Sequence, residues 1–230
     1  MQKAARIIGI IAIVVVIFTA MIISFNQKVP NSEKIWDQDT TIGNIDAENY
    51  FIIYSDFACP YCVAFENAII EHEEEFQKYI EENDILLEIR LSDYLYEYGQ
   101  SNPISSRYSS EAAYCAKKEG KFWDYYNHTI TSIWNSFFKT LGKSAFTELN
   151  QQDKNYWIKL GTEVGLGEKF ANCVKNNETI DEIEKVAAKM VKNTSGLPYF
   201  KFNKYIFDGF NLSDGWEHVK MHFNSGLKSK

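Results

Sequence analysis

The chain has 230 residues and a formal net charge of −7, with 45% hydrophobic and 15% aromatic residues. An acidic balance of this size argues against a surface that binds nucleic acid or phosphate groups. The sequence also holds no lysine- and arginine-rich patch and no glycine-rich phosphate loop. Without the apolar N-terminal run, about 200 residues remain, which is enough to bury one good core.

That N-terminal run covers residues 7–25 and follows Lys3 and Arg6. Its length just suffices to span a bilayer, and basic residues in front of it are expected to stay in the cytoplasm. We therefore expect residues 1–25 to form a signal anchor with one transmembrane helix at the cell membrane. The alternative is a cleaved signal peptide and a secreted or periplasmic protein, but Phe18 stands where a small residue is needed. Both interpretations place the rest of the chain outside the cytoplasm, where disulfides persist.

Residues 26–42 are polar and mixed in charge, and they are expected to link the membrane to a folded domain. The apolar, aromatic and β-branched run over residues 50–55 then predicts a buried strand. This strand leads through Asp56 into Cys59-Pro60-Tyr61-Cys62, and a helical pattern follows.

Two cysteines three positions apart at the start of a helix can close into a small disulfide ring. Pro60 suits the first helical position, because its missing N–H would be unpaired there anyway. The free N–H groups and the dipole at this helix end favour negative charge on Cys59, and the thiolate is the reactive form of cysteine. The pattern therefore predicts thiol–disulfide exchange. For Asp56 we expect a carboxylate that caps the helix start, with proton transfer near Cys62 as the alternative.

Two other interpretations of the cysteine pair remain open. A Cys-x-x-Cys pair can form half of a zinc site, but the chain offers no second pair, because Cys115 and Cys173 stand alone. An inert structural disulfide is the other alternative. We expect no metal and no cofactor.

The elements after the cysteines predict a βαβ unit. Apolar residues recur at helical spacing over residues 63–82, with glutamates on the outer face, and residues 85–91 read as a strand. The order strand, helix, strand favours parallel pairing of the two strands. A loop is expected over residues 92–103.

Residues 104–175 predict several helices, which we interpret as an insertion into the domain. Their aromatic stripe is expected to be core, with a groove for unfolded chains as the alternative. A further helix is predicted over residues 178–192. The strands 197–202 and 205–208 predict a hairpin, and residues 214–223 predict a last helix.

At this point the sequence resembles the DsbA-like thiol–disulfide oxidoreductases of the thioredoxin superfamily, over about residues 43–223. Four segments carry the resemblance: Asp56-Phe57-Ala58-Cys59-Pro60-Tyr61-Cys62, Glu111-Ala112-Ala113-Tyr114-Cys115-Ala116 with Gly120-Lys121-Phe122-Trp123, Phe170-Ala171-Asn172-Cys173, and Gly196-Leu197-Pro198-Tyr199-Phe200.

The resemblance implies an α/β thioredoxin fold, with residues 43–103 and 176–230 as the thioredoxin domain and residues 104–175 as an inserted helical domain. It also implies that Pro198 is preceded by a cis peptide bond and lies against the Cys59–Cys62 disulfide. Two residues depart from the common family pattern. Leu197 replaces the usual valine or threonine, and Tyr61 stands where strong oxidants often have histidine, which leaves the direction of electron flow open.

The function implied is the introduction of disulfides into exported proteins, with Cys59 as the exposed nucleophile and Cys62 as the buried resolving thiol. The expected partners are exported polypeptides with cysteines and a membrane protein that reoxidises the pair. A reductase or isomerase with the same site is the first alternative, and a membrane-tethered binding module for metal or unfolded chains is the second. Because exported cysteines seldom stay free, and because some family members carry such a bond, Cys115 and Cys173 are expected to pair, with two buried thiols as the alternative.

Overall fold

The computed structural model describes residues 37–99, 101–139, 145–190 and 196–229. The predicted membrane segment and most of the linker lie outside these residues. Among the described residues, none of the helices combines the length and apolar character that crossing a bilayer requires.

A five-stranded mixed sheet in the order β1-β3-β2-β4-β5 forms the centre of the domain. Its strands are β1 (Thr41–Gly43), β2 (Asn49–Ser55), β3 (Ile85–Leu91), β4 (Tyr199–Phe202) and β5 (Tyr205–Asp208). The predicted parallel pairing of β2 with β3 is confirmed, with Ile53 opposite Ile89. The hairpin of β4 and β5 is also confirmed, and the remaining pairs are antiparallel.

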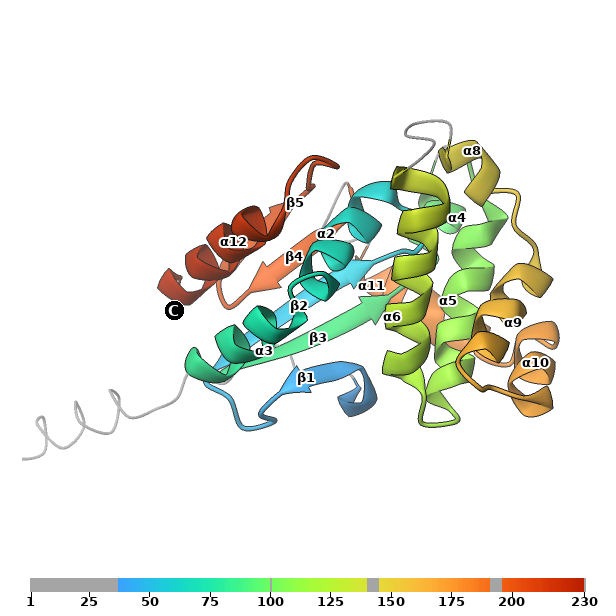
Figure 1. Ribbon diagram of the computed structural model, residues 1–230, viewed down its shortest axis with the longest axis horizontal. Helices are drawn as coiled ribbons and strands as arrows, with labels where there is room; N and C mark the ends of the chain where they lie inside the picture. The colour runs from blue at the N-terminus through green and yellow to red at the C-terminus, as the bar shows by residue number, and fades with distance from the viewer. Residues whose placement is uncertain (1–36, 100, 140–144, 191–195, 230) are drawn as a thin grey trace, which may run out of the picture. The chain divides into compact units, whose positions relative to one another are not determined.

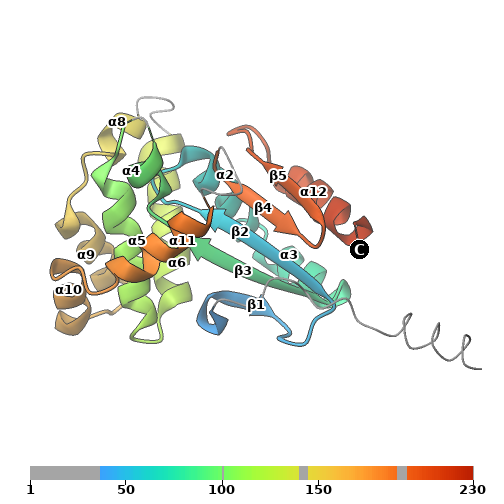
Figure 2. The same ribbon diagram turned by 180° about the vertical axis from the view of Figure 1, so that it is seen from behind.

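Helices cover both faces of this sheet, as the two opposite views show (Figures 1 and 2). The helices α2 (Pro60–Ile70), α3 (Glu73–Glu82) and α12 (Trp216–Lys228) cover one face, and α11 (Ile180–Met190) lies on the other. Alternate residues of β2 therefore enter different layers. Phe51 stacks on Phe202 at 4.4 Å under α12, whereas Tyr54 accepts a 2.6 Å hydrogen bond from the buried Arg90 on the opposite face.

The chain between β3 and α11 forms a helical block beyond the carboxyl ends of β2 and β3 (Figure 1). Its helices are α4 (Tyr94–Tyr98), α5 (Ile104–Lys117), α6 (Phe122–Ile133), the π-helix η2 (Trp134–Phe138), α8 (Ala145–Leu149), α9 (Lys154–Glu163) and α10 (Glu168–Lys175). The apolar and aromatic residues of α6 and η2 that form the predicted stripe are buried or partly buried, with Phe122, Tyr126 and Ile130 at most 4% exposed. This burial agrees with a role in the core.

Three local expectations are wrong. Residues 63–82 form two helices instead of one, because the backbone at His72 leaves helical geometry and its ring stacks on Trp216. Residues 38–42, which were expected to belong to the linker, instead form a short 3-10 helix, η1 (Gln38–Thr40), and, with Gly43, the edge strand β1. The loop expected over residues 92–103 contains α4. The elements β1 and α4 are too short for their apolar residues to show a strand or helix period.

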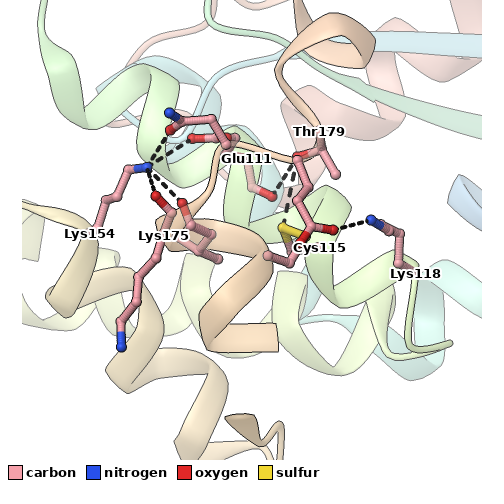
Figure 3. Close-up of a disulfide and its surroundings, with 10 residues drawn as sticks. Glu111, Cys115, Lys118, Lys154, Lys175 and Thr179 are labelled. Atoms are coloured by element: carbon pink, nitrogen blue, oxygen red, sulfur yellow. Dashed lines mark hydrogen bonds and ion pairs between the residues drawn. A yellow bond between two sulfur atoms is a disulfide. The ribbon is translucent and has the colours of Figure 1, made fainter. Parts of the chain in front are cut away.

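A disulfide between Cys115 and Cys173 joins α5 to α10 within the helical block. Around it, Thr179 donates a 3.1 Å hydrogen bond to the backbone oxygen of Glu111, and Lys118 pairs with Glu178 at 2.7 Å. Lys154 lies at the other end of the same cluster and donates to the backbone oxygens of Val174 and Lys175 (Figure 3). The disulfide therefore lies among segments that hydrogen bonds and an ion pair also hold together.

Replacing both cysteines in the variant C115A/C173A is expected to lower the free energy of unfolding by about 2–4 kcal/mol. The reason is that the bond closes a loop across a sequence separation of 58 residues and so restricts the unfolded chain. Urea unfolding followed by circular dichroism measures the effect. Equal stability of the variant and the native protein, both under oxidising conditions, would contradict a structural role for this bond.

Candidate active site

The candidate site lies where the chain leaves β2 and enters α2. Every residue of β2 is buried, and the loop that follows is closed by the Cys59 N–H, which donates a 2.9 Å hydrogen bond to the backbone oxygen of Asp56. Cys59 is the N-cap residue of α2, Pro60 is the first residue of the helix, and Cys62 follows in its first turn.

The two cysteines face each other across this turn. Both carry free thiols, and the Cys62 N–H donates to the Cys59 sulfur at 3.4 Å. A donor that points at sulfur at a helix N-terminus favours negative charge on that atom. Burial raises the pKa of Cys62 well above its ordinary value, and Cys59, Glu66 and Asp56 raise it further. One thiol is therefore placed to react and the other to hold its proton.

The expectation of an exposed Cys59 is wrong. Cys59 is 3% exposed and Cys62 is fully buried. The physical reason is the capping position itself, which turns the Cys59 sulfur back toward the N–H group of its own helix. Tyr61, between the two, is 43% exposed and gives the site its outward aromatic ring.

The peptide bond between Leu197 and Pro198 is cis. Tyr199 pairs with Tyr54 in the sheet, so the same register carried on places Pro198 opposite Ser55, where β2 ends. Pro198 is buried and Leu197 is partly exposed. The backbone oxygen of Pro198 accepts a 2.9 Å hydrogen bond from the Gly209 N–H. The cis bond thus lies at the end of the sheet from which the cysteine helix starts.

Asp56 does not cap α2, because Cys59 holds that position. Its fully buried carboxyl instead accepts hydrogen bonds from the Ala58 N–H at 2.9 Å, from the Leu95 N–H at 3.1 Å and from the Ser106 hydroxyl at 2.6 Å. One side chain therefore ties the loop before Cys59 to α4 and α5. Burial raises its pKa to about 7, against the lowering effect of these hydrogen bonds.

A second buried acid was missed by the sequence analysis, which assigns the glutamates of this helix to its outer face. Glu66 is 1% exposed and lies four positions after Cys62, which is one helical turn. Burial raises its pKa to about 8. Tyr126 of α6, whose ring lies 5.6 Å from that of Phe57, is the other missed residue. The four-residue spacing could have pointed to Glu66, because it places this side chain on the same face of the helix as Cys62.

The described residues contain no group of three or more cysteine, histidine, aspartate or glutamate side chains arranged to hold a metal ion. Cys115 and Cys173 are bonded to each other in the helical block, at a different place from the Cys59 and Cys62 pair. The chemistry that the site itself offers is an exchange of bonds between sulfur atoms.

Comparison with known proteins places this geometry in a family. The family model described as Thioredoxin matches residues 36–219. The chain therefore belongs to the thioredoxin family.

Solved structures give the same fold. BdbD from Bacillus subtilis has a TM-score of 0.59 at 17% identity, covering 82% of this chain and 92% of that one. A thioredoxin-like oxidoreductase from Silicibacter pomeroyi has a TM-score of 0.57 at 16% identity, covering 84% and 95%. The thiol-disulfide exchange protein alpha-DsbA2 from Wolbachia pipientis has a TM-score of 0.56 at 15% identity, covering 85% and 90%.

Two curated proteins match only in part. The CRISPR-associated protein MJ1674 of Methanocaldococcus jannaschii is 30% identical over 97 residues, or 40% of this chain. Protein Ycf2 of Huperzia lucidula is 28% identical over 139 residues, or 59% of this chain. The chain spans 14% and 6% of the length of these two relatives. Matches to such small parts of long proteins carry no argument about function.

The raised pKa of Asp56 makes stability depend on pH with a defined sign. The folded protein keeps this proton up to about pH 7, whereas the unfolded chain loses it near pH 4. The free energy of unfolding is therefore highest below pH 4 for this group and falls between pH 4 and 7, by up to about 1.4 kcal/mol per pH unit. In the variant D56N, position 56 no longer binds or releases a proton. We therefore expect the free energy of unfolding to fall less steeply over this range, by up to about 1.4 kcal/mol per pH unit.

Urea unfolding at a series of pH values measures this slope. The matched control is D46N, which removes an exposed aspartate and should leave the slope unchanged. Parallel slopes for D56N and the native protein would show that Asp56 is ionised in the folded state throughout this range.

Proposed function

We propose that this protein is an extracytoplasmic thiol–disulfide oxidoreductase that introduces disulfides into exported polypeptides through Cys59 and Cys62. The observation that carries the proposal is the position of Cys59 as the N-cap of α2, with its sulfur 3.4 Å from the Cys62 N–H. Membership of the thioredoxin family supports it.

The proposed reaction starts from the oxidised protein. A substrate thiolate attacks the Cys59 sulfur, the bond between Cys59 and Cys62 breaks, and Cys62 leaves as a thiolate that takes up a proton. A second thiolate of the substrate then attacks the substrate sulfur of the mixed disulfide, which forms the substrate disulfide and releases Cys59 as a thiolate. The two electrons removed from the substrate reside in the reduced Cys59 and Cys62 pair. A membrane redox partner must take these electrons to restore the oxidised form.

The direction of electron flow follows from the reduction potential of the pair. An oxidase is expected near about −120 mV, and a reductase near about −270 mV. Tyr61 is the residue between the cysteines that is most exposed, and it differs from the histidine of many strong oxidants in the resembling family. We therefore expect exchange of Tyr61 for histidine to raise the potential.

Oxidised full-length protein is expected to form disulfides in a reduced, unfolded polypeptide, with one substrate disulfide formed per pair consumed. The variant C59S should be inactive, because the attacked sulfur is gone. The variant C62S should also fail to oxidise this substrate, because it cannot form the disulfide that the substrate thiolate attacks. Mixed with a polypeptide that already carries a disulfide, the Cys59 thiolate of C62S should attack that bond and stay in a mixed disulfide, because the Cys62 thiol that would displace it is missing. Thiol counting and mass spectrometry follow both products.

The control is C115A/C173A, which removes the two cysteines that lie away from the site and should retain the activity. Loss of activity in this control, together with native activity in C59S, would assign the reaction to Cys115 and Cys173 and would contradict the proposal.

We further propose that residues 7–25 hold the protein in the cell membrane with the catalytic domain outside. Alkaline carbonate washing of membranes is expected to leave the full-length chain in the pellet, because an inserted apolar helix resists extraction. Mass spectrometry of the intact chain separates the two possibilities. Release into the wash with an intact N-terminus would contradict the anchor, and release of a chain that lacks this run would support the cleaved signal peptide.

A further inference from the structure

A cavity of about 300 Å³ lies between the helices α2, α3 and α6 and the strands β1 and β3. This volume is at the low end of the range that small-molecule sites occupy. Apolar side chains form much of its wall, among them Ile69 of α2 and Leu87 and Ile89 of β3. The helix α6 lies beside α2 here, so the helical block closes one side of the cavity (Figure 1). The exchange of sulfur bonds proposed above uses none of this space.

Three aromatic side chains line the cavity: Phe76 of α3, and Trp123 and Tyr126 of α6. The ring centres of Trp123 and Tyr126 lie 5.4 Å apart, and the two ring planes meet at 76°. Two lining rings set nearly at right angles form a corner, and the face of an aromatic ring carries negative potential. Cations bind over such faces, and cages of aromatic rings recognise quaternary ammonium groups. This corner is therefore suited to an organic cation.

The charged groups in the cavity wall have the complementary sign. Glu66 of α2 and Glu73 of α3 both line the cavity, and no lysine, arginine or histidine does so among the residues that the structure describes. Glu66 is buried, whereas Glu73 is exposed. A buried carboxylate is unfavourable unless a positive charge or hydrogen bonds compensate it. A bound cation would supply positive charge at this place, and a bound anion would be repelled.

The groups around Glu66 agree with a missing positive charge. Burial raises the pKa of Glu66 to about 8, and the charge of Asp56 also raises it, while the hydroxyls of Ser55 and Tyr126 lower it. None of these influences comes from a cationic side chain. An opposite charge within about 4–6 Å favours the ionised form of an acid. A cation at the corner of Trp123 and Tyr126 would therefore stabilise the Glu66 carboxylate.

We propose that this cavity binds a small quaternary ammonium compound that carries an aromatic or branched apolar group. Its ammonium group lies in the corner of Trp123 and Tyr126 with the carboxylate of Glu66, and its apolar part packs against the wall formed by β3. The site is independent of the proposed exchange of sulfur bonds, because it uses neither Cys59 nor Cys62.

Other ligand classes fit these walls less well. A sugar or polyol would leave hydroxyl groups without hydrogen bonds against the apolar wall. A phosphate or carboxylate ligand would meet two acids and no base among the described lining residues. An uncharged apolar molecule would fill the space and leave the Glu66 carboxyl without a positive partner. A quaternary ammonium ion matches the walls best, because its methyl groups need no hydrogen bond and its charge is spread over them.

A pair of matched ligands tests the proposal. Full-length protein in an uncharged maltoside detergent is titrated in a calorimeter with benzyltrimethylammonium chloride, and we expect one ion to bind per chain. The matched ligand is dimethyl benzyl carbinol, which has nearly the same shape but an uncharged carbon in place of the nitrogen. We expect the carbinol to bind at least about 10-fold more weakly, because only the charged ligand gains from the aromatic faces and the carboxylate.

Two variants locate the bound ion. W123L removes an aromatic face but keeps an apolar side chain, and it is expected to raise the Kd of benzyltrimethylammonium by about 5- to 30-fold. E66Q removes the charge in nearly the same volume, and at a pH above 8 it is expected to raise this Kd by at least about 10-fold. Circular dichroism verifies that each variant is folded.

Each variant has a matched control. W134L replaces a partly buried tryptophan at the start of η2 that does not line the cavity. E111Q replaces another buried acid, which lies on α5 beside the Cys115–Cys173 disulfide (Figure 3). Both controls should bind benzyltrimethylammonium with the native affinity.

The pH dependence of binding gives a further readout. The cation is expected to bind the ionised form of Glu66, so the native affinity should rise up to about pH 8 and level off above it. The other titratable groups that face Glu66 are Asp56, Cys62 and Tyr126, with Glu73 along the cavity wall. All of these remain in E66Q, so the part of the rise that disappears in this variant belongs to Glu66.

Three results would overturn the proposal. Absence of cation binding at millimolar concentration would remove the site. Equal affinities for the cation and the carbinol would show an apolar pocket that does not select charge. Native affinity for the cation in folded W123L or in folded E66Q would place the bound ion elsewhere. Oxidation of a reduced polypeptide by the native protein is measured in parallel, and its failure would contradict only the proposed function.

Discussion

The arrangement of the site depends on the carboxyl of Asp56. This side chain is fully buried and accepts hydrogen bonds from the loop before Cys59, from α4 and from α5. It therefore joins the central sheet to the helical block at the point where α2 begins. Because the start of a helix sets the direction of its free N–H groups, these contacts also set where the Cys59 sulfur meets the Cys62 N–H. The reactivity proposed for Cys59 depends on this contact between its sulfur and the Cys62 N–H.

Burial then gives the two sides of the cysteine pair different properties. The Cys59 side is formed by the helix N-terminus and by the exposed ring of Tyr61, and negative charge is favoured there. The Cys62 side is a water-poor interior with Asp56, Glu66 and Tyr126, in which desolvation raises the pKa of every one of these groups. Exchange of a disulfide needs both properties, because one sulfur must attack or be attacked as an anion while the other binds and loses a proton.

The sequence allowed the long elements to be predicted, since β2, β3 and α11 each show a run or period that matches their burial. It also located the cysteine pair and the proline of the cis bond, through spacing and family resemblance. It did not locate Glu66, because the glutamates of residues 63–82 were all assigned to the solvent face of an amphipathic helix, whereas α2 is buried at every position from Cys62 to Ala68. Two of the three partners of Asp56 could not be predicted either, since they come from segments 39 and 50 residues away.

The central claim is that Cys59 and Cys62 form a reversible disulfide with each other. The most direct measurement is to equilibrate the full-length protein in glutathione buffers of graded poise, quench it with acid, and map its cysteines by mass spectrometry. The account predicts that the Cys59 and Cys62 pair passes from dithiol to disulfide at one defined poise. A pair that stays reduced at every poise, or a Cys59–glutathione adduct that Cys62 never displaces, would contradict it.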